Sequence, residues 1–271
     1  MNIFYNKYME FIGVNRVAFT IFGYDIYWYG IIISFAILIA YLVSLYLVKV
    51  RKLNSDLSFE ILISAIPIGI VFARLTAVLF DSSLNITDFF NFRTGGMSII
   101  GAIFGGAIGL ILLKIIKKRS LLESADLIVT VLILAQAIGR WGNYFNSEIY
   151  GQLVTNPALQ FFPYSVLIDG NYYEALFFYE FVLDLIGFIG LFFIYKKVHI
   201  RGVATASYLL YYGTIRTILE TRRNTKYVLT IFGAPYSIIM SVIMIIAGAS
   251  LLTTVLVKYF KNKKLEKVNG R

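Results

Sequence analysis

Cysteine is absent from this chain of 271 residues, and histidine occurs once, as His199. Without cysteine there are no disulfides, no thiolate nucleophile and no thiolate metal ligands, and one histidine rules out a centre with several histidine ligands. Charged residues are also scarce: they make up 15% of the chain, whereas a soluble domain usually carries about a quarter. These absences argue against a soluble domain and against a metal site built from cysteines or several histidines.

Apolar residues make up 59% of the chain, and apolar runs close to the roughly 20 residues needed to cross a bilayer recur throughout it. The pattern predicts an all-α, polytopic integral membrane protein with about seven transmembrane helices. The predicted spans are 26–48, 59–80, 97–116, 124–139, 176–195, 203–219 and 236–257.

Basic residues predict the orientation of these spans. Four segments on alternate loops hold 16 of the 25 lysines and arginines, which puts those loops in the cytoplasm, the N-terminus outside and the C-terminus inside. The net charge of +10 is therefore attributed to cytoplasmic loops and anionic lipid, and not to a nucleic-acid partner. The four segments are 49–52, 114–119, 196–201 and 258–271.

No repeat and no boundary between soluble domains interrupts the chain, so residues 1–271 are predicted to form a single membrane domain. The loop at about 143–175 contains apolar clusters as well as proline and glycine, and we expect it to fold on the outer membrane face. Residues 258–271 form a basic cytoplasmic tail.

Charged residues inside a bilayer are costly and mark function or a pairing partner. Arg216, Glu220 and Arg223 are spaced to lie on one helical face, and Glu180 and Asp184 share a face of the fifth span. One interpretation is an ion-pair network that fixes helix register. The other is a binding site, because an excess of outward-facing arginines with few free carboxylates suits an anionic ligand.

The stretch "AIGRWGNYFNSEIYG" (137–151) lies where the fourth span ends and is unusually polar for a membrane edge. It places Arg140 beside Asn143, Asn146 and Glu148 among glycines, which allow a ligand to approach the backbone closely. A ligand that is anionic, reachable from outside and at membrane depth is a phospholipid headgroup. The residues alone therefore predict a phospholipid-binding site in the outer leaflet, without naming a reaction.

Two further features have simple packing interpretations. Gly101, Gly105 and Gly109 recur every four residues, a pattern typical of close helix contact. Trp28 and Tyr29 begin the first span, where aromatic residues commonly form an interfacial belt.

The stretch "GRWGNYFNSEIYG" (139–151) resembles the defining motif of the prolipoprotein diacylglyceryl transferase family, and every fixed position of that motif matches. The similarity extends from about residue 18 to the end of the seventh span. Other matching segments follow in the family's order: "WYG" (28–30), "GGMS" (95–98), "FYE" (178–180) and "YGTIRTILETRR" (212–223).

The resemblance implies a bacterial enzyme of the cytoplasmic membrane with its active site toward the extracytoplasmic side. Its partners would be phosphatidylglycerol, the lipobox peptides of preprolipoproteins and membrane lipids. The diacylglyceryl group would pass to the lipobox cysteine thiol, giving a thioether and glycerol 1-phosphate, with no metal or organic cofactor. The alternative is a non-catalytic protein of the same fold that binds or moves phospholipid.

The resemblance also implies roles for individual residues. Arg140 and Arg216 match the family's essential arginines and would stabilise charge on the leaving phosphate. The other catalytic candidates are Tyr29 and Glu148. The substrate-binding candidates are Asn143, Asn146, Gly151, Gly96, Glu220 and Arg223.

The chain departs from the family's pattern at two places. Ile100 stands where many members have a histidine proposed as the base for the incoming thiol, and "EALFFYE" (174–180) lacks a His-Pro pair. Glu148, Tyr29 or the lipid phosphate is then expected to take the thiol proton, because a thiol with a pKa of about 8.5 needs little help. Alternatively, the chain is a paralogue with altered substrate choice, or an inactive relative that binds lipid.

Overall fold

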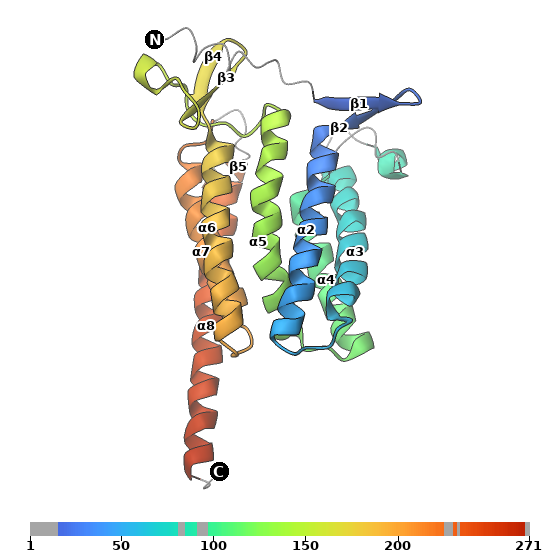
Figure 1. The fold of residues 1–271 in the computed structure, drawn as a ribbon, viewed down its shortest axis with the longest axis vertical. Coiled ribbons are helices and arrows are strands. Elements are labelled where there is room, and N and C mark those ends of the chain that lie inside the picture. The colour runs from blue at the N-terminus through green and yellow to red at the C-terminus, as the bar shows by residue number, and fades with distance from the viewer. Residues whose placement is uncertain (1–15, 81–84, 91–96, 225–229, 232–233, 269–271) are drawn as a thin grey trace. The chain divides into compact units, whose positions relative to one another are not determined.

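The structure, a computed structural model, describes residues 16–80, 85–90, 97–224, 230–231 and 234–268. Within these residues, seven helices of 18 residues or more follow one another along the chain (Figure 1). They are α2 (Trp28–Val50), α3 (Leu57–Phe80), α4 (Ile99–Lys117), α5 (Leu121–Phe145), α6 (Leu176–Lys197), α7 (Val203–Glu220) and α8 (Tyr236–Val268).

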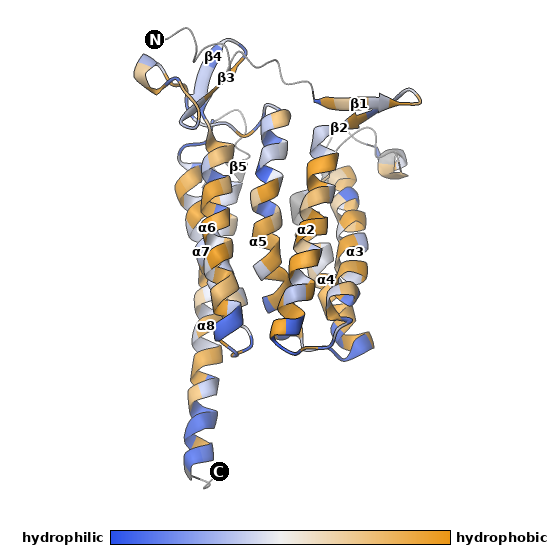
Figure 2. Cartoon of the chain, viewed as in Figure 1, coloured by the Kyte–Doolittle hydropathy of each residue, from blue (hydrophilic) through white to orange (hydrophobic). Residues whose placement is uncertain are grey.

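Each of the seven predicted apolar spans coincides with one of these helices. Among the described residues, five helices are long and apolar enough to cross a membrane: α2, α3, α5, α6 and α8. Figure 2 shows hydrophobic residues along most of these helices and hydrophilic residues over the last turns of α8. The prediction of a mostly helical membrane protein is confirmed, whereas the number of crossings and the orientation stay predictions.

The chain divides into two compact units, of which one comprises residues 41–128. Within this unit α3 packs along α4, and the glycines of α4 make the close approach possible. A Cβ added to Gly105 would lie 2.6 Å from the carbonyl oxygen of Ile68, and one added to Gly109 would lie 2.6 Å from that of Ser64. Only glycine permits backbones at this distance, so the predicted small-residue packing is confirmed for α4.

Polar groups in this unit also have partners. Ser98 caps α4: its side chain accepts from the Gly101 N–H at 3.4 Å. Arg74 is fully buried and donates from Nε to the carbonyl oxygen of Phe89, which lies in the 3-10 helix η1 (Ile86–Phe90). Arg119 binds the carboxylate of Glu60 through Nε at 2.6 Å and Nη2 at 2.9 Å.

The other unit comprises residues 1–40 and 129–271. In it α7 packs against α6 on one side and α8 on the other. Gly213 of α7 faces α8, where an added Cβ would lie 2.9 Å from the carbonyl oxygen of Ser241. Leu176 of α6 packs with Ile215 and Leu219 of α7 in an apolar cluster. This packing fixes α6 and α7 side by side.

Three short antiparallel hairpins and a second 3-10 helix, η3 (Pro157–Leu159), supplement the helices. The first two hairpins turn on two residues with positive φ, Phe22–Gly23 and Asp169–Gly170, as a type I′ turn requires. The hairpins are β1 (Val17–Ile21) with β2 (Tyr24–Tyr27), β3 (Ser165–Ile168) with β4 (Asn171–Glu174), and β5 (Thr230–Ile231) with β6 (Ala234–Pro235).

The segment between α5 and α6 packs on the helices that flank it. Val166 of β3 and Phe177 of α6 belong to one buried cluster, and Trp141 of α5 packs against it. The ring centroids of Trp141 and Phe177 are 5.6 Å apart, edge to face. The predicted outer loop is therefore a folded structure, while its contact with the membrane face stays a prediction.

Candidate active site

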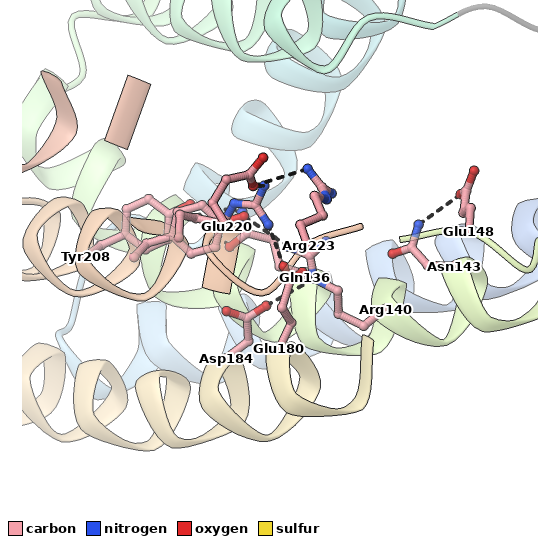
Figure 3. Close-up of polar contacts among 11 residues, drawn as sticks. Gln136, Arg140, Asn143, Glu148, Glu180, Asp184, Tyr208, Glu220 and Arg223 are labelled. Atoms are coloured by element: carbon pink, nitrogen blue, oxygen red, sulfur yellow. Dashed lines mark hydrogen bonds and ion pairs between the residues drawn. The ribbon is translucent and has the colours of Figure 1, made fainter. Parts of the chain in front are cut away.

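Three helices carry a cluster of charged side chains at corresponding ends (Figure 3). Arg140 lies near the end of α5, Glu180 near the start of α6, and Arg216 near the end of α7. The sequence placed Arg140 beyond the fourth span. The structure instead continues α5 to Phe145, so Arg140 is inside the helix, where partners on α6 and α7 satisfy its charge.

Glu180 bridges the two arginines that the sequence predicted as catalytic. Its Oε2 lies 2.6 Å from Nε of Arg140, and its Oε1 accepts from Nη1 of Arg216 at 2.5 Å. Asp184, one turn further along α6, lies 3.6 Å from Nε of Arg140. Arg140 and Arg216, 76 positions apart in the sequence, therefore share one carboxylate.

Glu220 extends the network along α7. Its Oε2 lies 3.3 Å from Nη2 of Arg216 and 3.3 Å from Nη1 of Arg223. Burial lowers the pKa of the Arg223 guanidinium, and the positive charge of Arg216 lowers it further. Arg223 is thus a cation that a bound anion would stabilise.

The cluster contains equal numbers of opposite charges: Arg140, Arg216 and Arg223 meet Glu180, Asp184 and Glu220. The expected excess of arginines is not found in this cluster, where each of the three carboxylates is paired with an arginine. The spacing of Glu180 and Asp184 showed that they share a face of α6 but not that this face meets α5 and α7. The ion-pair interpretation is therefore correct for the cluster, and it does not exclude binding.

The ion pairs that Glu180 makes with Arg140 and Arg216 are largely buried. The side chains of Arg140 and Arg216 are each 14% exposed, and that of Glu180 is 1% exposed. In such surroundings ion pairs are screened little by solvent, and a missing partner is costly. The carboxylates hold both guanidinium groups in fixed orientations.

A neutral layer, not identified from the sequence, lies one turn away from the arginines. Nη2 of Arg140 donates to the Tyr212 hydroxyl at 3.1 Å, and the Tyr212 ring stacks on Tyr208 with centroids 5.5 Å apart. The Tyr208 hydroxyl accepts from the Gln136 amide at 3.0 Å and donates to its oxygen at 3.2 Å. The four-residue spacings 136–140 and 208–212 were the available signal, since each pair lies on one helical face.

The stretch that follows Arg140 folds around Glu148. Its carboxylate accepts from the amides of Asn143 at 2.9 Å and Asn146 at 3.3 Å, and its backbone N–H donates to the Asn143 carbonyl oxygen at 3.0 Å. Ser147 and Ile149 have φ of 52° and 58°, values that are unusual for residues other than glycine. This strained turn brings three of the predicted site residues together.

Tyr29 joins the same region from α2. Its ring lies against Gly142, where an added Cβ would approach Cδ2 of Tyr29 to 2.7 Å. The neighbouring ring of Trp28 stacks on Phe145 with centroids 5.1 Å apart. Both aromatic residues therefore contact the motif helix, which a purely interfacial belt would not require.

The remaining predicted positions fall in different places. Gly151 lies against Glu174 at the end of β4. Gly96 lies outside the described residues, and Ile100 falls in the first turn of α4. Among the described residues, no group of three or more histidine, cysteine, aspartate or glutamate side chains is placed to hold a metal ion.

Comparison with known proteins gives the same family as the resemblance of the motif at 139–151. The family model described as prolipoprotein diacylglyceryl transferase matches residues 16–254. Proteins named phosphatidylglycerol–prolipoprotein diacylglyceryl transferase are similar over most of their length. That of Finegoldia magna is 34% identical over 88% of this chain and 94% of its own, and that of Clostridium novyi is 34% identical over 88% and 95%. That of Listeria innocua is 33% identical over 94% of this chain and 96% of its own. The chain belongs to the prolipoprotein diacylglyceryl transferase family.

Proposed function

We propose that this protein transfers the diacylglyceryl group of phosphatidylglycerol to the lipobox cysteine of a preprolipoprotein. The thiol loses its proton, and the sulfur attacks the glyceryl carbon that carries the phosphate. A carbon–sulfur bond forms, the carbon–oxygen bond breaks, and glycerol 1-phosphate leaves with the bonding electron pair. Membership of the family and the names of the relatives support this reaction.

The observation that carries the proposal is the bridge at Glu180. One carboxylate binds Arg140 at 2.6 Å and Arg216 at 2.5 Å, so the two guanidinium groups lie on either side of it. Forked donors suit phosphate oxygens, and donors fixed before the reaction need no reorganisation as negative charge develops on the leaving group. The pair is therefore suited to an anion that gains charge in the transition state.

The contacts of Arg140 leave donors for a ligand. Glu180 and Asp184 engage Nε, and Tyr212 accepts from Nη2, whereas none of these three contacts uses Nη1. Asn143 and Asn146 orient Glu148, which is the carboxylate nearest to Arg140 in the sequence. We assign the thiol proton to Glu148, to Tyr29 or to the lipid phosphate. We assign Gly96, Gly151, Glu220 and Arg223 to substrate binding.

Chain direction supports a site on the outer side of a bacterial cytoplasmic membrane. The cluster lies at the end of α5, the start of α6 and the end of α7. The opposite end of α6 carries Lys196 and Lys197, and Arg201 follows before α7. By the positive-inside rule we assign those residues to the cytoplasm and the cluster to the outside, and we propose seven crossings with the N-terminus outside.

The proposed reaction is tested by mass spectrometry. The purified full-length protein is incubated with phosphatidylglycerol and a synthetic lipobox peptide, and the peptide should gain the mass of one diacylglyceryl unit. A peptide whose cysteine is replaced by serine should gain nothing. Binding of phosphatidylglycerol without any mass gain would instead favour a non-catalytic lipid-binding protein.

Arginine-to-lysine variants test the phosphate-binding role. Arg140→Lys and Arg216→Lys should each lower the transfer rate by about 100-fold or more, because a point charge does not reproduce a forked donor at developing charge. Arg201→Lys, in the loop between α6 and α7, is the matched control and should retain the wild-type rate. Wild-type turnover in both cluster variants would rule out the proposed phosphate contact.

A further inference from the structure

Glu174, the last residue of β4, is a buried carboxylate that none of the assigned roles explains; it is 4% exposed. Its backbone joins it to the end of the motif: the Gly151 N–H donates to its carbonyl oxygen, and its own N–H donates to the Gln152 carbonyl oxygen, both at 3.0 Å. Its side chain also takes part, since Oε2 accepts from the Gln152 N–H at 3.4 Å. Glu174 therefore holds the Gly151–Gln152 segment from two sides.

Gly151 leaves no free space on this side. A Cβ added to it would lie 2.7 Å from both Cβ and Oε2 of Glu174, and 3.2 Å from the carbonyl oxygen of Arg222. The end of the motif is thus enclosed by the Glu174 side chain and by the chain that follows α7. The Glu174 side chain therefore lies directly against Gly151.

The partner of Glu174 is Arg222, whose Nη2 donates to Oε1 at 2.6 Å. The Arg222 side chain is 53% exposed, whereas that of Glu174 is 6% exposed. The next residue, Arg223, binds Glu220 in the charged cluster and is 11% exposed. Two adjacent arginines therefore serve different carboxylates, one at the motif end and one in the cluster.

We propose that Arg222 is a positioning residue, which acts through Glu174 to hold the Gly151–Gln152 segment in its binding geometry and does not itself contact the substrate. This inference rests on the proposed function, because Gly151 is assigned there to substrate binding. It separates Arg222 from Arg223, although the two adjacent residues have the same side chain.

The unequal burial of the pair predicts unequal effects of substitution. Removal of Arg222 leaves a buried carboxylate without its cation, and such a group moves toward water or takes up a proton. Removal of the charge of Glu174 leaves only a half-exposed guanidinium, which water solvates. When both charges are removed together, neither penalty remains.

The experiment compares Arg222→Ala, Glu174→Gln and the double variant in the full-length protein with phosphatidylglycerol and lipobox peptide. Relative to wild type, kcat/KM should fall about ten-fold in Arg222→Ala and about three-fold in Glu174→Gln and in the double variant. The loss in Arg222→Ala should be mainly a rise in KM for the lipid, measured well below each variant's unfolding midpoint. A purely structural role would lower the midpoint and leave KM unchanged. Arg201→Ala, a substitution outside the site, should match wild type.

A double variant as impaired as Arg222→Ala would overturn the proposal, because Arg222 would then contact substrate directly. Wild-type KM in Arg222→Ala would overturn it as well. If Arg222→Ala does not fold, kcat/KM of the double variant is compared with that of Glu174→Gln. Equal values support the proposal, and a lower value for the double variant overturns it. The wild-type protein tests the proposed function separately, because it should form product. If it forms none, lipid binding by the variants is measured instead as the rise in unfolding midpoint that phosphatidylglycerol causes.

Discussion

The α3–α4 pair and the α5–α6–α7 group are both built from apolar helices, yet different contacts hold each of them together. Between α3 and α4 the closest contacts join backbone to backbone, at Gly101, Gly105 and Gly109. Among α5, α6 and α7 the central contacts join charged side chains through Glu180. Each of these sets of contacts lies within its own unit of the chain.

The two kinds of contact contribute differently to stability. Backbone contact requires no partner chemistry and gives a tight, apolar pair. Buried charges add little net stability over apolar packing, but loss of one partner is costly. A region that keeps six charged side chains together among apolar helices is therefore better explained by function than by stability.

Glu180→Gln tests this contrast with the largest expected effect. Both arginines lose their shared anion, so the free energy of unfolding should fall by about 3–5 kcal/mol. The transfer rate should fall by about 100-fold or more, because the guanidinium groups lose their fixed geometry. Thermal unfolding and the mass-gain assay measure the two effects.

Glu266→Gln on the exposed last turns of α8 is the control for this substitution and should change neither quantity. Wild-type transfer by Glu180→Gln would show that the bridge is not needed to orient the arginines. The charged side chains would then serve only to hold α5, α6 and α7 together, as the glycine contacts hold α3 and α4 together.

The α3–α4 pair offers a test at adjacent positions. An added Cβ at Gly105 meets backbone atoms of α3 and Cβ of Phe72 at 2.6–2.9 Å, whereas none of the atoms described lies within 4 Å of one at Gly106. Gly105→Ala should therefore lower the free energy of unfolding by about 1–3 kcal/mol. Gly106→Ala should leave it unchanged or raise it by up to about 1 kcal/mol, since alanine favours helix.

Thermal unfolding in the same lipid or detergent compares the two alanine variants. Both should retain the wild-type rate of transfer when assayed below their midpoints. Equal stability of the two variants would show that the glycine spacing of α4 does not determine the packing of this pair.

The helices were predictable from sequence because apolar length is a property of one segment. Their ends were less so. The fourth apolar run was predicted to end at residue 139, but α5 continues to Phe145, because Arg140 and Asn143 find partners inside the protein. Likewise α8 extends to Val268, since lysine, leucine and glutamate favour helix outside the apolar run. Hydropathy reports on the surroundings of a segment and not on where its helix stops.

The candidate site was predictable in part. Spacing showed which residues share a face of one helix, as for Arg216 and Glu220, and the structure confirms their contact. It did not show which faces meet, so the pairing of Glu180 with both arginines was missed. The roles of these residues in binding and catalysis stay predictions. The β3–β4 hairpin was missed although Asp169–Gly170 is a strong turn signal, because strands of only four residues carry little periodicity of their own.

Substitutions at Tyr208 and Gln136 should have the smallest effect of these predictions. They test whether the neutral layer responds to the loss of a partner as the charged cluster does. Tyr208→Phe keeps the ring stacked on Tyr212 but leaves the Gln136 amide without its hydroxyl partner. The free energy of unfolding should fall by about 1–2 kcal/mol, the cost of an unsatisfied buried polar group. In the double variant Tyr208→Phe with Gln136→Leu, both polar groups are absent and most of this loss should be recovered. Such recovery, measured by thermal unfolding, distinguishes a neutral hydrogen-bonded pair from the Glu180 bridge, where arginine charges remain after the carboxylate is removed. A double variant less stable than either single variant would contradict this account, because the pair would then contribute packing that leucine and phenylalanine do not reproduce.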